Sequence, residues 1–147
     1  MNLTIECSCR VMYWTDWGSF PKIEKAEMTG QQRSAIVTTG LRWPNGLTLD
    51  KDKNRLYWVD AYLDKLEYLD LNQTKRVTLI SYSFYLSHPF GLTILGDKLY
   101  WTDWNWNAVH EADKETGGDI TRFVTGIGRP MDIHGYNLSE YSLPQGW

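Results

Sequence analysis

The chain has 147 residues, the length of a single globular domain. Its 15 Lys and Arg against 18 Asp and Glu leave a net charge of −3, which argues against binding nucleic acid or lipid headgroups through a clustered positive field. Apolar residues make up 42% of the chain, too large a share for a disordered protein. The 8 Trp and 9 Tyr are unusual in number, and they recur in fixed phrases.

The N-terminal residues have neither the basic start nor the apolar core of a signal peptide, and the sequence has no run of about 18 apolar residues that could span a membrane. Two cysteines, Cys7 and Cys9, are too few for a four-ligand metal site, and a disulfide between them would close a strained ring. We expect neither a metal nor another cofactor. Three Asn-x-Ser/Thr triplets favour an extracellular, glycosylated chain, at Asn2, Asn72 and Asn137.

A phrase of four residues repeats along the chain. Tyr13-Trp14-Thr15-Asp16 recurs from Tyr57 and again from Tyr100, which is a period of about 43 residues. A second phrase keeps the same step, as Trp43-Pro44-Asn45-Gly46 and His88-Pro89-Phe90-Gly91. The middle period contains four short β-type runs, at 46–50, 55–60, 65–71 and 75–80, separated by turn residues. Four strands in each period of this length predict the blade of a β-propeller.

The predicted fold is all-β, with three four-stranded blades at 3–38, 46–80 and 91–124. Residues 131–135 are predicted to form the first strand of a fourth blade, so that the partial propeller covers 1–136 and residues 137–147 form a tail leading out of it. The consecutive Tyr and Trp of each phrase should point to opposite faces and pack against different neighbouring blades. The Asp that closes each phrase should accept hydrogen bonds that fix the strand end. Calcium binding is a weaker alternative, because these aspartates come one per blade.

Strand direction locates a candidate binding surface. Because neighbouring strands alternate in direction, the loops between second and third strands and the linkers between blades emerge on one face. We call this the aromatic face; it collects Trp17, Ala61 and Trp104 and, around the blade-entry prolines, Trp43, Asn45, His88, Phe90, Arg129 and Met131. Large exposed aromatic residues are typical anchors for protein ligands. The loop with Asn72 emerges on the opposite face, so a glycan there would leave the aromatic face free.

These phrases resemble those of the low-density lipoprotein receptor family, whose propeller signature is Tyr-Trp-Thr-Asp, and the resemblance runs from Leu3 to Trp147. The wording is most similar to the receptor-related proteins, including the branch of Wnt co-receptors. The resemblance implies a six-bladed propeller in the extracellular part of a membrane-anchored receptor. It also implies a secreted protein ligand and a role in Wnt signalling or endocytosis.

Six residues correspond, within this resemblance, to the ligand face of the Wnt co-receptor propellers: Trp17, Trp43, Asn45, His88, Trp104 and Met131. The family docks a short Asn-x-Ile-type segment of its ligand there, and Asn45 matches the residue that reads the ligand Asn. A structural alternative for Trp43 and Asn45 is turn formation. An unperturbed histidine titrates near endosomal pH, so His88, His110 and His134 suggest release of a ligand in acid.

The chain departs from the family in having about half of a six-bladed ring. Three blades leave an apolar face open at each end, and a head-to-tail pair of half-propellers would complete the ring. Two other functions fit a propeller, namely a matrix scaffold of the nidogen type and a calcium-dependent lactonase-like hydrolase. The sequence has no Gly-x-Ser-x-Gly, His-Glu-x-x-His or phosphate-binding glycine loop, so we predict no catalytic residues and no enzyme.

Overall fold

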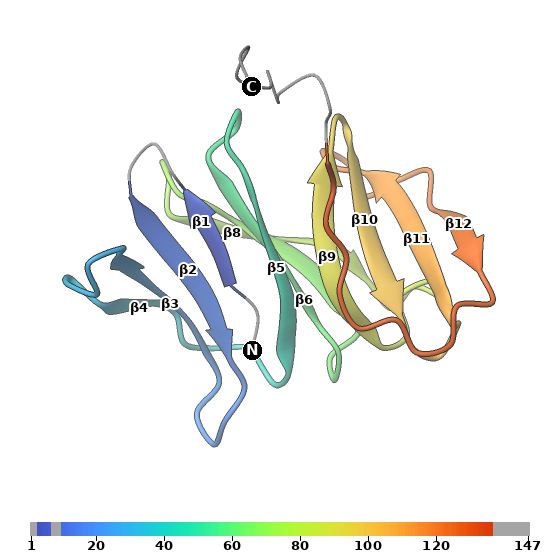
Figure 1. The fold of residues 1–147 in the computed structure, drawn as a ribbon, viewed down its shortest axis with the longest axis horizontal. Helices are drawn as coiled ribbons and strands as arrows, with labels where there is room; N and C mark the ends of the chain where they lie inside the picture. The colour runs from blue at the N-terminus through green and yellow to red at the C-terminus, as the bar shows by residue number, and fades with distance from the viewer. Residues whose placement is uncertain (1–2, 7–9, 137–147) are drawn as a thin grey trace, which may run out of the picture.

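The computed structural model of the chain describes residues 3–6 and 10–136, and shows three β-sheets that fan out side by side (Figure 1). Each sheet has four antiparallel strands in sequence order, so consecutive strands are neighbours throughout. We number the sheets as blades 1 to 3 along the chain. The part of the chain that the structure describes holds no helix long and apolar enough to cross a membrane. The predicted glycosylation sites Asn2 and Asn137, the cysteines and the 137–147 tail lie outside these residues.

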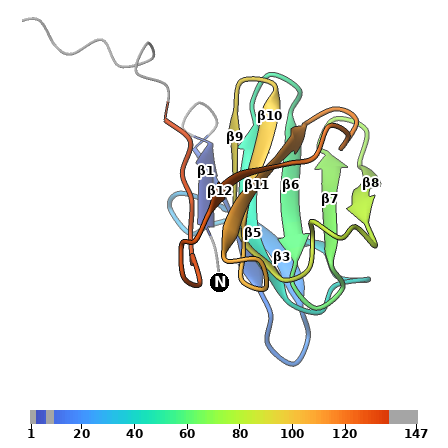
Figure 2. The same cartoon turned by 90° about the vertical axis from the view of Figure 1, so that its right-hand side faces the viewer.

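The three blades are built alike. Blade 1 consists of β1 (Leu3–Glu6), β2 (Val11–Asp16), β3 (Lys22–Glu27) and β4 (Ser34–Val37). Blade 2 consists of β5 (Pro44–Asp50), β6 (Arg55–Asp60), β7 (Lys65–Asp70) and β8 (Lys75–Ser81). Blade 3 consists of β9 (Pro89–Leu95), β10 (Lys98–Asp103), β11 (Ala108–Asp113) and β12 (Thr121–Thr125). Figure 2 shows β6, β7 and β8 running side by side. The all-β fold of four-stranded blades is thus confirmed.

An aspartate is the last residue of β5, β6, β7, β10 and β11, and its carboxylate accepts hydrogen bonds from the backbone of the turn that follows. The last residue of β5, Asp50, accepts hydrogen bonds from the backbone N–H groups two and three residues further on, at 3.1 and 3.3 Å. The same arrangement recurs at the ends of β6, β7, β10 and β11. This device explains why β7 ends at Asp70, one residue before the predicted end of its run. Two of the three signature aspartates, Asp60 and Asp103, thus fix a strand end in the predicted way.

The core lies between the blades, in two layers. The layer between blades 1 and 2 includes Tyr13 and Trp58, and the layer between blades 2 and 3 includes Tyr57 and Trp101. Each signature Tyr therefore faces the next blade and each Trp faces the previous one, as the alternation of a strand requires. In blade 2 both rings are fully buried. Blade 2 thus buries apolar side chains on both faces.

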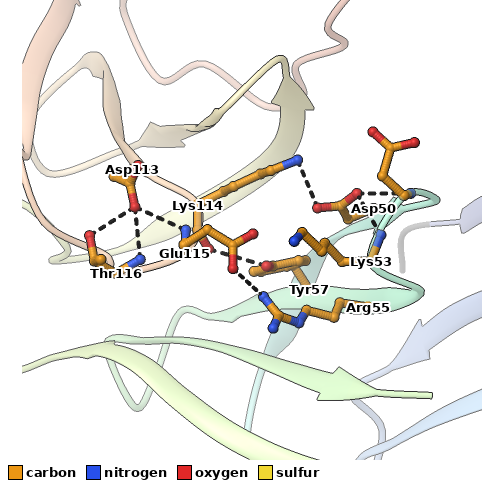
Figure 3. A network of polar contacts seen from close by, with 9 residues as sticks. Asp50, Lys53, Arg55, Tyr57, Asp113, Lys114, Glu115 and Thr116 are labelled. Atoms are coloured by element: carbon orange, nitrogen blue, oxygen red, sulfur yellow. Dashed lines mark hydrogen bonds and ion pairs between the residues drawn. The ribbon is translucent and has the colours of Figure 1, made fainter. Parts of the chain in front are cut away.

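Polar contacts also join blades 2 and 3, at the end of the sheets opposite the aromatic face (Figure 3). Lys114 lies 2.9 Å from the Asp50 carboxylate, and Arg55 lies 2.7 Å from Glu115. The hydroxyl of Tyr57 donates to the backbone oxygen of Lys114 at 3.1 Å. Burial raises the pKa of Tyr57 to about 12, although the nearby Arg55 opposes this shift. The buried phenol therefore stays neutral and donates across the gap between the blades.

Glycine lets the inner strands of blades 2 and 3 approach closely. A Cβ at Gly46 would lie 2.5 Å from the backbone nitrogen of Leu92 and 2.7 Å from the backbone oxygen of Phe90. Both contacts are shorter than side chains tolerate, so only glycine fits at this point of β5. Gly91 has the same relation to the segment after blade 3, where a Cβ would lie 2.8 Å from the Cα of Asp132.

Residues 131–135, predicted as the first strand of a fourth blade, are not paired in any of the three sheets. They run in extended form along β9 (Figure 1), and the nearby Gly135 N–H donates to the Thr93 hydroxyl at 2.8 Å. A strand assignment requires a hydrogen-bonded ladder, and the described residues contain no second strand of that blade to pair with this segment. The segment therefore lies beside blade 3, against its inner strand, without belonging to a sheet.

The close approach at Gly46 gives a test of the blade packing. We expect Gly46→Ala to lower the free energy of unfolding by about 1–3 kcal/mol, because the added methyl group must push two backbones apart. Gly128→Ala is the matched control, since no atom lies within 4 Å of a Cβ there. Urea unfolding followed by tryptophan fluorescence measures both. Equal stability of the two variants would contradict the packing described here.

Candidate functional site

A pocket of about 340 Å³ lies on the aromatic face, around the inner ends of the three blades. It brings together all six residues predicted for the ligand face. A seventh residue, Phe90, was assigned to the aromatic face but not to the predicted site. The lining residues are Trp17, Trp43, Asn45, His88, Phe90, Trp104 and Met131.

The aromatic rings of the pocket contact one another. Phe90 stacks on Trp104 with ring centroids 4.9 Å apart and planes within 5°. The His88 ring lies 5.4 Å from Trp104 and 6.1 Å from Trp43. Trp17 and Trp43 stay 48% and 39% exposed, so the rim of the pocket presents large apolar surface to solvent. Such half-buried rings resemble the anchors of protein interfaces.

Asn45 lies in the wall of the pocket and is buried. Its side-chain amide donates to the backbone oxygen of Pro89 at 3.5 Å, and its own backbone oxygen accepts from the Thr15 hydroxyl at 3.1 Å. Asn45 thus links all three blades. Because Asn45 lies within β5, this role is packing between blades and not the turn formation considered as an alternative. It coexists with a position on the pocket wall.

The carboxylate of Asp60, at the end of β6, fixes the pocket backbone on one side. It accepts hydrogen bonds from the backbone N–H groups of Arg42 and Trp43, in the linker from blade 1, at 2.7 and 3.1 Å. It also accepts from Tyr62 and Leu63, in the loop that follows β6, at 3.1 Å each. One buried carboxylate therefore binds a linker and a loop, and sets the position of Trp43.

Asp103, at the end of β10, repeats this arrangement in blade 3. It accepts from the backbone of Ser87 and His88 in the preceding linker, and from Asn105 and Trp106 in the following loop. The Trp104 indole N–H donates to the backbone oxygen of Pro130 at 2.9 Å, next to Met131. We call the linker-and-loop arrangement of Asp60 and Asp103 the aspartate clamp.

The three histidines of the chain differ in burial and in their distance from the pocket. His88 lines it, whereas His110 is buried in blade 3, stacked on Trp101 with centroids 5.6 Å apart. Burial lowers the pKa of His110, and the nearby Asp103 opposes this only in part. His134 lies 3.2 Å from Asp132, at the surface. The described residues include no group of three or more His, Cys, Asp or Glu side chains able to hold a metal ion.

A second hollow on the aromatic face was missed by the sequence reasoning. It lies between blades 2 and 3, next to the pocket, and its exposed rings come from the β6–β7 loop and the linker 82–88. The signal was present, because that linker carries Tyr82 and Phe84, two aromatic residues outside any repeated phrase. Of the predicted glycosylation sites, Asn72 is exposed in the β7–β8 loop, at the other end of blade 2.

The sequence matches the family model for the low-density lipoprotein receptor repeat class B over residues 10–51 and 54–94. The chain is 42% identical over 109 residues to vitellogenin receptor Yl of Drosophila melanogaster, which covers 74% of this chain and 5% of that receptor. It is also 42% identical over 102 residues to the low-density lipoprotein receptor-related protein 5-like protein of Homo sapiens, covering 69% of this chain and 40% of that protein.

A solved structure of the nidogen/laminin complex contains a similar fold. It matches this chain with a TM-score of 0.80 and 33% sequence identity, over 90% of this chain and 50% of the other. The chain therefore spans a small part of the insect receptor and half of the matched structure. The propeller architecture predicted from the repeats is confirmed by this match and by the family model.

The aspartate clamp can be tested by removing one charge. Asp60→Asn places an amide N–H₂ against backbone N–H groups in a fully buried position, so we expect a loss of about 2 kcal/mol or more in the free energy of unfolding. Asp16→Asn is the matched control in blade 1, where the partly exposed carboxylate accepts a hydrogen bond from the backbone N–H of Gly18 in the following loop. It should change stability by less than about 0.5 kcal/mol. Similar losses in both variants, measured by thermal unfolding, would rule out the clamp.

Proposed function

The chain belongs to the family of proteins that carry low-density lipoprotein receptor class B repeats, and from this we propose that it is an extracellular, non-enzymatic module of a cell-surface receptor that binds a protein ligand through its aromatic face. The observation that carries the proposal is the pocket of Trp17, Trp43, Trp104 and their neighbours. The aspartate clamp holds the backbone of two of the pocket residues, Trp43 and His88, through their N–H groups. A preformed apolar pocket of this kind binds with little loss of side-chain freedom.

The chemistry of the pocket supports a short segment of the Asn-x-Ile type as its occupant. The lining is mostly apolar, which suits a branched aliphatic side chain. Asn45 contributes an amide to the wall, and an amide is the natural hydrogen-bonding partner of a ligand Asn side chain. Receptors of the Wnt co-receptor branch and endocytic receptors are both compatible with this mode of binding.

A matrix scaffold of the nidogen type is the second candidate. The observation in its favour is the structural match to the nidogen/laminin complex, in which a chain of similar fold is crystallised with a matrix protein. In that case the same aromatic face would bind a matrix component instead of a soluble ligand. A lactonase-like hydrolase has no comparable support, because the aspartates nearest the pocket are engaged by backbone N–H groups.

Peptide binding tests the proposed site. A peptide of sequence acetyl-Pro-Asn-Ala-Ile-Gly-amide should bind the wild-type chain, and Trp104→Ala should weaken it about tenfold or more, the effect of losing a central aromatic anchor. Phe20→Ala is the control, because Phe20 is an exposed aromatic residue outside the pocket. Isothermal titration calorimetry measures the affinities. Wild-type affinity in the Trp104 variant would place the binding site elsewhere.

We also propose that two copies pair head-to-tail, blade 3 of one against blade 1 of the other. Contacts inside the chain support this arrangement. Arg76 of blade 2 lies over the Trp58 ring, pairs with Glu67, and donates to the backbone oxygens of Thr39 and Gly40 at the end of blade 1. This arginine therefore ties blade 2 to blade 1.

The open faces of blades 1 and 3 carry the residues that correspond to the two sides of this Arg76 contact. In blade 1, Arg33 lies over Trp14 and pairs with Glu24, as Arg76 does with Trp58 and Glu67. At the end of blade 3, Thr125 and Gly126 correspond to Thr39 and Gly40, and both glycines have a left-handed backbone. The Arg76 guanidinium lies beside Gly40, whereas no atom lies within 4 Å of a Cβ at Gly126. Arg33 of a second copy would fit there.

Light scattering tests the pair. We expect a mass twice the 17.2 kDa of one chain, because each copy would then cover both open faces of the other. Phe123→Asp should return the monomer, since Phe123 is exposed on the open face of blade 3 and contacts Tyr100 there. Phe20→Asp, in a loop away from both faces, should leave the pair intact. A wild-type monomer would overturn this part of the proposal.

A further inference from the structure

The second hollow of the aromatic face has a volume of about 720 Å³ and is formed by blades 2 and 3 together. We call it the rim groove and define it by Tyr62, Asp64, Lys65, Tyr82, Phe84 and Trp106. The groove adjoins the pocket, because Tyr62 on its wall touches Trp43 on the pocket wall, with ring centroids 5.1 Å apart. A ligand held in the pocket therefore reaches the groove without leaving the surface.

Exposed aromatic rings line the groove, and the structure holds them in place. Tyr62, Phe84 and Tyr82 are 54%, 66% and 93% exposed. Phe84 packs on Trp106 with centroids 4.3 Å apart, and the Trp106 indole N–H donates to the Phe84 backbone oxygen at 2.7 Å. Exposed rings that are fixed by such contacts lose little freedom on binding a ligand.

Asp64 differs from the other aspartates of this face. It is half-buried at the start of the groove, in a left-handed backbone conformation, and no hydrogen bond or ion pair engages its carboxylate among the described residues. Burial raises its pKa, and the nearby carboxylates of Asp103 and Asp60 add to this effect, while His88 opposes it. Because Asp60 and Asp103 are occupied by backbone N–H groups, Asp64 is the carboxylate that remains available to a ligand.

We propose that the rim groove binds a Lys or Arg side chain of the protein ligand, with the cationic group on the Asp64 carboxylate and the aliphatic stem against Tyr62 and Phe84. The proposal rests on the function assigned above and adds a second contact point to it. Aromatic faces attract cations, and a basic side chain carries the apolar stem that such rings cover. A cationic group there would also offset the electrostatic repulsion of Asp64 by the carboxylates of Asp60 and Asp103.

A basic side chain fits the groove better than a metal ion does. A calcium ion takes six to eight oxygen ligands, and the described residues offer no group of three carboxylate, imidazole or thiol side chains arranged to hold one. The groove instead offers the Asp64 carboxylate among exposed rings, which matches one cationic group on an apolar stem. Lys65 also lines the groove, and the Arg42 guanidinium lies 5.1 Å from the Tyr62 ring centroid. The ligand would then combine an apolar, Asn-containing segment with a basic residue.

The indole N–H signals of two tryptophans separate the two contacts in an NMR titration. The Trp106 indole lies in the groove, and the Trp104 indole lies at the pocket. The first probe is the tripeptide acetyl-Gly-Lys-Gly-amide, with norleucine in place of Lys as its uncharged control. The second probe is a series of Pro-Asn-Ala-Ile peptides that carry Lys, or norleucine, two to four residues further on.

We expect the Lys tripeptide to shift the Trp106 signal to saturation and the norleucine tripeptide to leave it unchanged. In the longer series, the best Lys peptide should bind about tenfold tighter than its norleucine counterpart, the range of a cationic contact to a ring and a carboxylate. In the Asp64→Asn variant, Lys and norleucine peptides should behave alike in both the tripeptide and the longer series. This variant should fold normally, because Asn accepts a left-handed backbone and the charge it removes is disfavoured by its surroundings.

Each outcome decides the inference. A Trp106 response to Lys that disappears in the Asp64 variant supports it, even if the Trp104 signal stays silent and the proposed pocket function fails. Equal effects of Lys and norleucine, or equal effects on the wild type and the Asp64 variant, overturn it, even if the Trp104 signal shows that the pocket binds the Asn-x-Ile segment. The absence of any Trp106 shift with either probe also overturns it.

Discussion

The adjacent tyrosine and tryptophan of each signature strand face opposite ways, and the arrangement of the blades depends on this. In blade 2 both Tyr57 and Trp58 are withdrawn from water, one against blade 3 and the other against blade 1. Since apolar burial stabilises in proportion to the area removed from water, a blade with two neighbours gains more than a blade with one. Blades 1 and 3 each keep a half-exposed ring, Trp14 and Tyr100, on a face that a further blade would cover.

The candidate binding surface follows from this packing. The blades place the ends of β6 and β10 side by side, and the aspartates at those ends bind the linkers and loops between them. As a result, aromatic residues that are far apart in the sequence, such as Trp17 and Trp104, line one pocket. The pocket and the rim groove are both products of the gaps between blades, so neither exists within a single repeat.

The repeats and the alternation of strands were enough to predict the blades, the opposite facing of the signature Tyr and Trp, and the aromatic face. The choice of the six residues that meet in the pocket came from the family resemblance. The repeats could not predict the rim groove, because Tyr82 and Phe84 lie in a linker outside the repeated phrases and their contacts with Trp106 depend on the packing of two blades. Residues 131–135, predicted as the first strand of a fourth blade, lie along β9 without pairing into a sheet. The local pattern of a strand is present there, but the ladder that makes a strand needs a partner.

The aspartate clamp depends on side chains at its acceptor end only. Its acceptors are side-chain carboxylates, but all of its donors are main-chain N–H groups. Every residue type except proline supplies such a donor, so the side chains at positions 43, 62 and 88 can change while the backbone stays in place. Substitutions at these positions can therefore alter the candidate binding surface without removing the hydrogen bonds that hold its backbone.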